Sequence, residues 1–551
     1  MLPLVAIAVL ILLLPFEPME PLASIVGFEV SHLEMAAFAL LTASAAAILT
    51  RRPSLRIPLA GSAIAFLLVF LISAGVAEGS SILPLKFTLR MAAAVVAFVL
   101  TSQALSVSPR FDLLFASLSI AGAATAAAAL IEVGPWSFDD AFLSRFREHS
   151  FEVGGRARVA ATFSYPNTAG GFLVLTLAPT LYFYRRRPFR AVSSIAALAI
   201  FAAVLLTYSR GALLGAAASS LLLWWMVRSR ESGRELTALL IAFVLMTAAL
   251  FALEPSYRWR TSSEGDRSWY EAEITPSRST LALEPGELAT TTVRISNVGK
   301  LTWRSTGRKP FHLSYRWFEL DGEDGVRPLA IEGERTRLDS PVAPGDTIDL
   351  VAALRAPREP GSYVIIWDMV HENTTWFSDK VGLGVPVTVA VGDAVSGAER
   401  ASARGIREAI HERSWRPGRM ELWRIALNLF RGNPLLGVGP DNFRWLYGPA
   451  SGHTAWDTRV FSNSLYLELL ATVGLFGCAA FGILVGRALL GLKQRAASGR
   501  SPFVAATLAA SLCGFLVHGL FDYLLAFTPI YLAFFVLLGA SSAALREETA
   551  A

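Results

Sequence analysis

The sequence predicts a mostly α-helical, polytopic membrane protein of about twelve spans, with an all-β sandwich inserted between the ninth and tenth spans. Its 551 residues are 53% hydrophobic and only 17% charged, and the apolar residues gather in blocks long enough to cross a bilayer. Between residues 275 and 392 the pattern changes to short alternating segments separated by Gly, Pro, Asn and Asp, which is typical of antiparallel strands.

The apolar blocks predict both the spans and their orientation. Lys and Arg gather after the second, sixth, eighth and tenth blocks, whereas loops 17–32 and 77–81 contain neither. Because basic loops are retained in the cytoplasm, we expect both termini inside and odd-numbered spans running outward. The net charge of +5 therefore reflects topology and indicates no nucleic-acid partner. The predicted spans are 2–16, 33–50, 57–76, 82–103, 111–132, 167–184, 191–208, 211–227, 236–253, 462–486, 503–520 and 524–545.

The composition divides the chain into five parts. Some seven short strands, such as those in "ATTTVRISNVG" and "GSYVIIWDMV", describe the sandwich. We expect Trp303, Trp317 and Trp367 in its core, and Trp376 exposed near a loop where it could stack on a sugar. The parts are a membrane domain of nine spans (1–255), a linker (256–274), the extracytoplasmic β-sandwich (275–392), an outer loop with an interfacial helix (393–461) and the last three spans (462–551).

Cysteine and histidine usage argues against a metal or redox centre. The two cysteines, Cys478 and Cys513, lie in apolar blocks, so neither a disulfide framework nor a cysteine-based metal site is expected. The seven histidines show no paired-ligand spacing. We therefore expect no metal and no cofactor.

Arginines on the outer side are the exceptions to the charge rule. These arginines lie in an outer loop and in the turn "TYSRGA". Their outer position indicates either an anionic ligand or pairing with nearby acidic residues. Within the fourth span, Lys86 and Arg90 lie one turn apart, where a central charge costs about 2.5–3.5 kcal/mol; snorkelling or an ion pair also explains them. The outer arginines are Arg145, Arg147, Arg156, Arg158 and Arg210, and the acidic partners considered are Asp139, Asp140 and Glu152.

A helix starting near Pro417 follows the sandwich and is interfacial by pattern. Arg419 points away from its polar stripe, toward the protein body, and is therefore favoured as a ligand residue. The turn "GVGPDNF" that follows is weak evidence for phosphate binding, because it does not lead from a strand into a helix.

Four segments in order resemble the O-antigen ligase and polymerase superfamily of bacterial integral membrane glycan transferases. They are "RVAATFSYPNTAGGFL" (158–173), "TYSRGALLG" (207–215), "RMELWRIALNLFRGNPLLGVGPDNF" (419–443) and "FSNSLYLELLATVGLFG" (461–477). In addition, "SNVGKLTW" and "APREPGSYVIIWDMVHENTTWFSD" resemble immunoglobulin-like domains attached to bacterial carbohydrate-active proteins.

The resemblance implies an enzyme at the outer face of the inner membrane. Its donor would be a glycan on undecaprenyl diphosphate, and its acceptor a lipid, another glycan or a protein. Arg210, Arg158 and Arg419, by their places in these motifs, would stabilise the departing diphosphate. Further substrate-binding candidates are Arg156, Arg90, Asn167, Asp441 and Asn442.

The acceptor-activating base is the open part of the mechanism. The ligases place a His-Asn pair at the mouth of the helix after the large loop, but this chain has Ser462 before Asn463, and a serine hydroxyl cannot take a proton near neutral pH. His453, with Asp457 nearby, and Glu468, inside a span, are candidate replacements; a third possibility is that no base is needed. His518 and Asp522 are expected to form a local hydrogen-bonded pair on one helix face, and a catalytic role for them is the alternative.

Two other functions stay open. A lipid-linked glycan transporter or flippase would have charges spread through the spans. In this chain, most of the unexplained basic residues gather on the outer side instead. A non-catalytic glycan assembly factor would make the sandwich the working part, so deletion of 275–392 would abolish polymer output while an Arg210 substitution would not.

Overall fold

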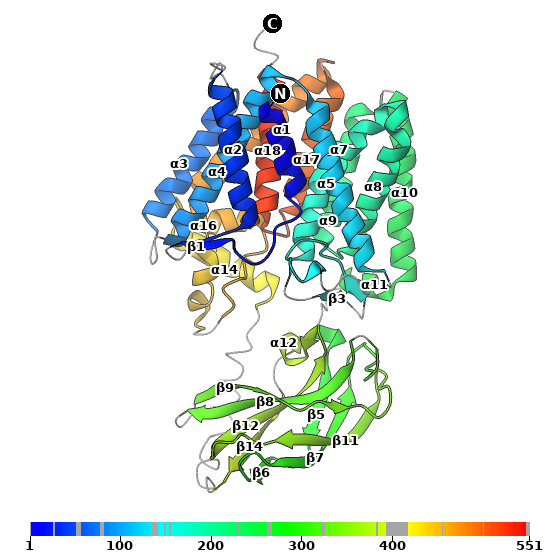
Figure 1. The fold of residues 1–551 in the computed structure, drawn as a ribbon, viewed down its shortest axis with the longest axis vertical. Helices are drawn as coiled ribbons and strands as arrows, with labels where there is room; N and C mark the ends of the chain where they lie inside the picture. The colour runs from blue at the N-terminus through cyan, green and yellow to red at the C-terminus, as the bar shows by residue number, and fades with distance from the viewer. Residues whose placement is uncertain are drawn as a thin grey trace.

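The fold is a bundle of helices with a separate lobe of β-strands at one end (Figure 1). The N-terminus and the end of the chain both lie at the end of the bundle away from the lobe. The computed structural model describes residues 2–25, 28–50, 57–77, 82–134, 142–147, 150–153, 156–229, 231–261, 267–307, 309–321, 325–381, 384–392, 417–453, 456–499 and 501–546.

Each of the twelve predicted spans coincides with a helix, but fewer qualify as spans by themselves. Eight of the described helices are long and apolar enough to cross a membrane, and α1, α3 and α17 are apolar but shorter. The structure therefore establishes eight candidate spans, and twelve stays a prediction. The helices are α1 (Leu2–Leu13), α2 (His32–Leu49), α3 (Ala60–Gly75), α4 (Ile82–Val107), α5 (Phe111–Glu132), α7 (Pro166–Tyr182), α8 (Arg190–Leu206), α9 (Arg210–Val227), α10 (Glu231–Leu253), α16 (Leu465–Ala497), α17 (Pro502–His518) and α18 (Thr528–Arg546).

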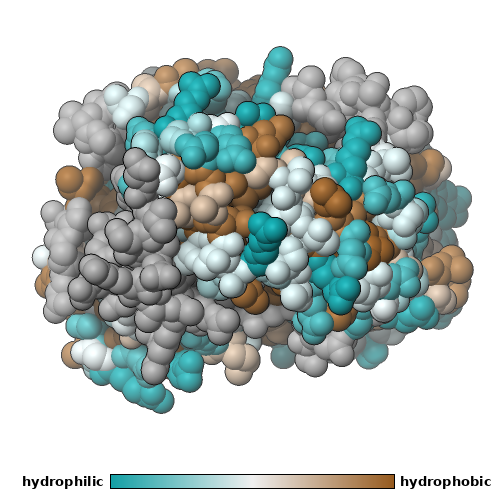
Figure 2. Space-filling view, turned by 90° about the horizontal axis from the view of Figure 1, so that it is seen from below, coloured by the Kyte–Doolittle hydropathy of each residue, from teal (hydrophilic) through white to brown (hydrophobic). Residues whose placement is uncertain are grey.

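The helix bundle has a more apolar surface than the β-strand lobe, as expected if the bundle lies in a membrane and the lobe in water. Large apolar side chains point outward from the bundle, among them Phe38, Leu49 and Val192 at 70%, 71% and 68% exposure. Viewed from the lobe's end, hydrophilic and apolar side chains are mixed over the face (Figure 2). An outward apolar surface on long helices is what lipid contact favours.

Small residues bring α9 against α17. On α9, Gly211, Gly215 and Ser219 repeat every four residues and share one face. A Cβ added at Gly215 would lie 2.6 Å from the carbonyl oxygen of Gly514, and one added at Gly514 would lie 2.9 Å from that of Gly215. Such glycine seams let helix backbones approach closely in membranes. The start of α9 is thereby placed beside the end of α17.

The helix α16 is interrupted at Gly474, where φ is 64° and ψ is −164°. A loop that follows α14 (Arg419–Gly432) replaces the missing helical hydrogen bonds. Val438 N donates to Ala471 O at 2.9 Å, and Leu475 N donates to Pro434 O at 2.8 Å. Backbone polar groups inside a membrane domain must be satisfied internally. The Gly-rich turn after α14 therefore serves as a backbone partner of the broken helix.

The helix α14 begins at Arg419, two residues after Pro417, near which the sequence predicts its start. Its N-cap is Gly418, so Pro417 lies just outside. Leu422, Ile425 and Ala426 form a small core with Phe443, Tyr447 and Ala471, which belong to α15 (Phe443–Leu446), its C-cap and α16. The exposed Met420 agrees with an interfacial position.

The lobe contains two sheets whose buried side chains share one core. Neighbouring strands are antiparallel except β14 and β6, which run parallel. The three-stranded sheet has the order β11 (Thr347–Arg355), β7 (Leu288–Asn297), β5 (Ala272–Pro276). The seven-stranded sheet contains β6 (Thr280–Leu283), β8 (Phe311–Asp321), β9 (Gly325–Glu332), β10 (Thr336–Arg337), β12 (Gly361–His371), β13 (Thr375–Trp376) and β14 (Pro386–Val391).

The tryptophans test the predicted core. Trp303, Trp317 and Trp367 are buried, as predicted. The exposed position expected for Trp376 is wrong, because its half-buried ring has the guanidinium groups of Arg316 and Arg335 at 4.6 Å and 5.0 Å from its centroid. Cation–π contacts of this kind already occupy the ring.

Short elements complete the bundle and the lobe. Two small hairpins are formed by β1 (Ala23–Ile25) with β2 (Phe28–Val30) and by β3 (Phe151–Val153) with β4 (Arg156–Arg158). The helix α11 (Pro255–Thr261) follows α10, and α12 (Ser378–Val381) lies within the lobe. Figure 1 shows β3 at the end of the bundle that faces the lobe.

The break in α16 makes a stability prediction. Gly474 has a backbone conformation essentially restricted to glycine, costing about 1–3 kcal/mol for other residues, and a Cβ there would lie 2.4 Å from the Leu435 backbone. Gly474→Ala should therefore lower the Tm in detergent markedly. Gly482, in the same helix with nothing within 4 Å of an added Cβ, is the control, and Gly482→Ala should leave the Tm unchanged or raise it. Equal Tm values for the two variants would contradict the interruption.

Candidate functional site

A cavity of about 520 Å³ lies where the lobe-side ends of several helices meet. Its walls combine charged and amide side chains with aromatic rings, which suits a ligand that has both charged and sugar-like parts. The lining residues are Met19, Arg147, Phe151, Arg158, Ser164, Tyr165, Pro166, Asn167, Thr168, Asp457, Arg459, Val460, Phe461, Asn463, Asp522, Tyr523, Leu524 and Phe527.

Arg158 enters the cavity from the second strand of the β3–β4 hairpin. Its Nε donates to the carbonyl oxygen of Thr207 at 2.7 Å, and an Nη donates to Asn167 Oδ1. Thr207 is the C-cap of α8, and Asn167 lies in the first turn of α7. The guanidinium is therefore oriented by two different helix ends.

Asp522 joins this group from a third segment. Asn167 Nδ2 donates to Asp522 Oδ1 at 2.6 Å, and His518 Nε2 lies 3.0 Å from Asp522 Oδ2. The His518–Asp522 pair is confirmed, but its expected place on one helix face is wrong, because α17 ends at His518. Arg158, Asn167, Asp522 and His518 thus form one continuous polar chain, which we call the cavity network.

Arg210 and Arg419 lie at the border of this network rather than in the cavity lining. A Cβ at Gly211 would lie 2.6 Å from His518 Cδ2 and 3.3 Å from Asp522 Oδ2, so the residue after Arg210 touches the network directly. Burial lowers the pKa of the Arg419 guanidinium, and the Asp522 carboxylate opposes that effect while Arg260 adds to it. Arg419 is therefore within electrostatic reach of Asp522, and it stays charged because the arginine pKa is so high.

Two of the other outer arginines, Arg147 and Arg156, have acidic partners that differ from those considered in the sequence. Arg147 pairs with Glu132, and Arg156 pairs with Glu254 at 3.1 Å. Asp139 and Asp140 lie outside the described residues, and the Glu152 carboxylate contacts Lys309 and His371 of the lobe.

Arg90 lies away from the cavity lining. Its Nε contacts Glu34 Oε1 at 2.7 Å, and Glu34 also forms a capping box with Ser31 at the start of α2. This is the ion pair that the sequence left open as an explanation. A substrate-binding role for Arg90 stays a prediction.

Just before the start of α16, the adjacent residues Ser462 and Asn463 lie in different environments. Asn463, with φ at 55°, lines the cavity, whereas Ser462 is fully buried. Ser462 N donates to Glu468 Oε2 at 2.8 Å, and the Glu468 side chain has no exposed surface. Glu468 therefore satisfies the backbone at the helix mouth and lies behind the cavity wall.

His453 is likewise absent from the cavity lining in the part of the chain that the structure describes. Its backbone N–H donates to Gly448 O at 3.0 Å, which closes a turn. The Asp457 carboxylate, expected near His453, contacts the Arg459 guanidinium at 3.0 Å. Asp457 and Arg459 both line the cavity.

Asp441 and Asn442 brace the turn that follows α14. Asp441 holds Arg444 through two hydrogen bonds of 2.9 Å and 2.7 Å, and Asn442 Nδ2 donates to Val438 O at 2.8 Å. Neither residue is among those that line the cavity. Their geometry is that of a structural turn, and substrate contact stays a prediction.

The outer position of Arg147 predicted an anionic ligand or an ion pair, and this arginine both lines the cavity and pairs with Glu132. No feature of the sequence singled out Arg459 or Tyr165 as cavity residues. Arg459 and Tyr165 do lie beside or within the resembling segments, so a wider window around each motif would have included them.

No group of three or more His, Cys, Asp or Glu side chains within the described residues is placed to hold a metal ion.

Two family models match parts of this chain. A family model described as O-antigen ligase matches residues 373–482, and one described as the Ig-like domain from next to BRCA1 gene matches 278–387. No protein of curated function matches the chain. The solved structure of Pseudomonas fluorescens alkylpurine DNA glycosylase AlkC bound to abasic-site DNA shares 10% identity over 60% of this chain and 97% of that one, but its TM-score of 0.15 carries no argument. The eight candidate spans indicate a multi-pass membrane protein, and the ligase match shows that residues 373–482 are similar to O-antigen ligases.

Proposed function

We propose that this chain transfers or polymerises a glycan carried by undecaprenyl diphosphate, at the outer face of the bacterial inner membrane. The observation that carries the proposal is the cavity network, in which Arg158 is joined through Asn167 to the Asp522 carboxylate. The ligase-family match at residues 373–482 supports a role in surface polysaccharide biosynthesis.

The arginines suit the leaving group of such a reaction. When the bond between the anomeric carbon and the diphosphate breaks, its electron pair leaves with the diphosphate, so negative charge grows on phosphate oxygens. Arg147, Arg158 and Arg459 line the cavity, and guanidinium groups bind phosphate oxygens through paired hydrogen bonds. Positioned cations in a site with little water stabilise such charge strongly.

Asp522 is the best-placed group to accept the acceptor's proton. It lines the cavity, while Asn167 and His518 fix both carboxylate oxygens. The acceptor oxygen would attack the anomeric carbon as its proton moves to Asp522. Glu468 and His453 lie outside the described cavity lining, so geometry favours Asp522 over either.

The position of the cavity agrees with chemistry on the outer side. The cavity is built from elements at the lobe-side end of the bundle, and both chain termini lie at the opposite end (Figure 1). The basic loops predict that those termini lie in the cytoplasm. A long glycan could then extend away from the membrane while its lipid stays in it.

The first prediction concerns Arg158. Arg158→Ala should lower glycan output about 100-fold or more, because removing one preorganised donor from a charged transition state costs roughly 10²–10³ in rate. Arg210→Ala and Arg419→Ala should lower it in the same direction. Glycan from the native host is compared on gels at matched protein level, with Arg294→Ala on the exposed face of the lobe as control. Normal glycan from Arg158→Ala would reject the assignment.

A second prediction separates the candidate bases. Asp522→Asn keeps the shape of the side chain but removes its basicity, so glycan output should be lost while the protein still accumulates in the membrane. Glu468→Gln and His453→Ala should leave most output. Loss of output from Glu468→Gln with normal output from Asp522→Asn would instead assign the base to Glu468.

A further inference from the structure

The β3–β4 hairpin contacts the lobe through β3, and both of its strands contribute a residue to the cavity. On the lobe side, the Glu152 carboxylate contacts Lys309 Nζ, and lies 3.7 Å from His371 Nε2. Lys309 Nζ also donates to Ser150 Oγ at 2.9 Å, and Ser150 Oγ donates to Asn373 O at 3.1 Å. We call these contacts the lobe clamp.

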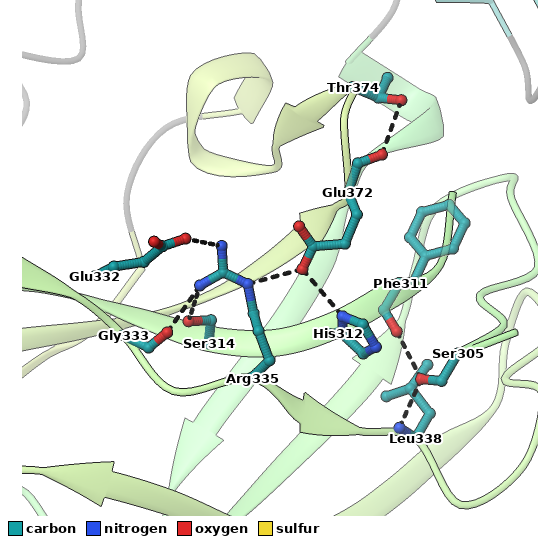
Figure 3. Close-up of polar contacts among 10 residues, drawn as sticks. All are labelled: Ser305, Phe311, His312, Ser314, Glu332, Gly333, Arg335, Leu338, Glu372 and Thr374. Carbon is teal, nitrogen blue, oxygen red and sulfur yellow. Dashed lines mark hydrogen bonds and ion pairs between the residues drawn. The ribbon is translucent and has the colours of Figure 1, made fainter. Parts of the chain in front are cut away.

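The lobe holds its part of the clamp firmly. Next to His371, Glu372 accepts from Arg335 Nε at 2.7 Å and lies 3.0 Å from His312 Nδ1 (Figure 3). The His371 ring stacks on Phe311 with centroids 4.0 Å apart. The turn that meets the hairpin is therefore fixed by interactions inside the lobe.

On the membrane side, the hairpin carries two cavity residues. Phe151 and Arg158 face each other in the antiparallel register, and both line the cavity. Glu152 follows Phe151 in β3, and its side chain is almost completely buried. A buried carboxylate requires its partner, because removing one member leaves an uncompensated charge.

We propose that the lobe positions Arg158 for catalysis through the clamp between Glu152 and Lys309. The contact between the hairpin and the lobe is seen in the structure, and only its effect on catalysis rests on the proposed function. Glu152 and Lys309 are then positioning residues. Separation of the lobe from the hairpin would remove the outer support of the strands, and Arg158 would then be held at the cavity only by its bonds to Thr207 and Asn167.

The mechanical part is tested by amide hydrogen exchange on the full-length protein in detergent. Lys309→Ala should speed exchange in the peptides that contain β3 and β4, because the hairpin loses its outer support. Lys309→Arg should retain protection, and Lys309→Glu combined with Glu152→Lys should restore it. The matched control is Asp349→Asn, which breaks an exposed ion pair of the lobe with Arg294 and should leave hairpin exchange unchanged. Unchanged exchange in Lys309→Ala would overturn the clamp.

The catalytic part uses the same variants in the glycan assay. Lys309→Ala and Glu152→Gln should reduce output at least tenfold at matched protein level, and the charge-swapped pair should recover it. If Arg158→Ala abolishes output but Lys309→Ala does not, the positioning role is wrong. If Arg158→Ala has no effect, the proposed function fails instead, and hydrogen exchange still decides whether the lobe holds the hairpin.

Discussion

The site depends on one buried anion, the Asp522 carboxylate. It comes from the segment between α17 and α18, yet its two oxygens are bound by Asn167 of α7 and His518 of α17. Because a buried carboxylate is costly unless it is hydrogen-bonded, these contacts fix the distance between the two helix ends. Gly211 makes room for the pair, since a Cβ there would lie 2.6 Å from His518. Close packing of α9 on α17 is therefore a condition for the cavity network.

Irregular backbone gathers around the same cavity. Tyr208 and Asn463 have positive φ angles of 51° and 55°, and each lies two residues before the first residue of a long helix. Such conformations cost energy and persist only where the surroundings determine them. Here they turn the chain so that α9 and α16 begin beside the cavity. The unwound turn of α16 at Gly474 shows the same principle, with a surface loop supplying the missing hydrogen bonds.

The sequence predicted what depends on local pattern. Apolar periodicity located the helices, and alternation located the buried tryptophans, because both signals come from neighbouring residues. Contacts between residues far apart in the sequence could not be predicted, because no sequence pattern pairs Arg147 with Glu132 or Asn167 with Asp522. The spacing of His518 and Asp522 did indicate a pair, but not that helix α17 ends between them. Of the residues proposed for the site, Arg158, Asn167 and Asn463 line the cavity, and the others lie outside its lining. Among those others, Arg210 directly precedes Gly211, which packs against His518 and Asp522, and Asp522 acts electrostatically on Arg419.

The central claim is that the cavity binds a lipid diphosphate through Arg158. It is tested most directly by measuring binding of undecaprenyl diphosphate to the purified full-length protein in nanodiscs, for wild type, Arg158→Ala and the lobe control Arg294→Ala. The account predicts saturable binding that Arg294→Ala preserves and Arg158→Ala weakens about tenfold or more, as loss of a charge-assisted hydrogen bond of about 1.5–3 kcal/mol implies. Equal affinity for wild type and Arg158→Ala would contradict it.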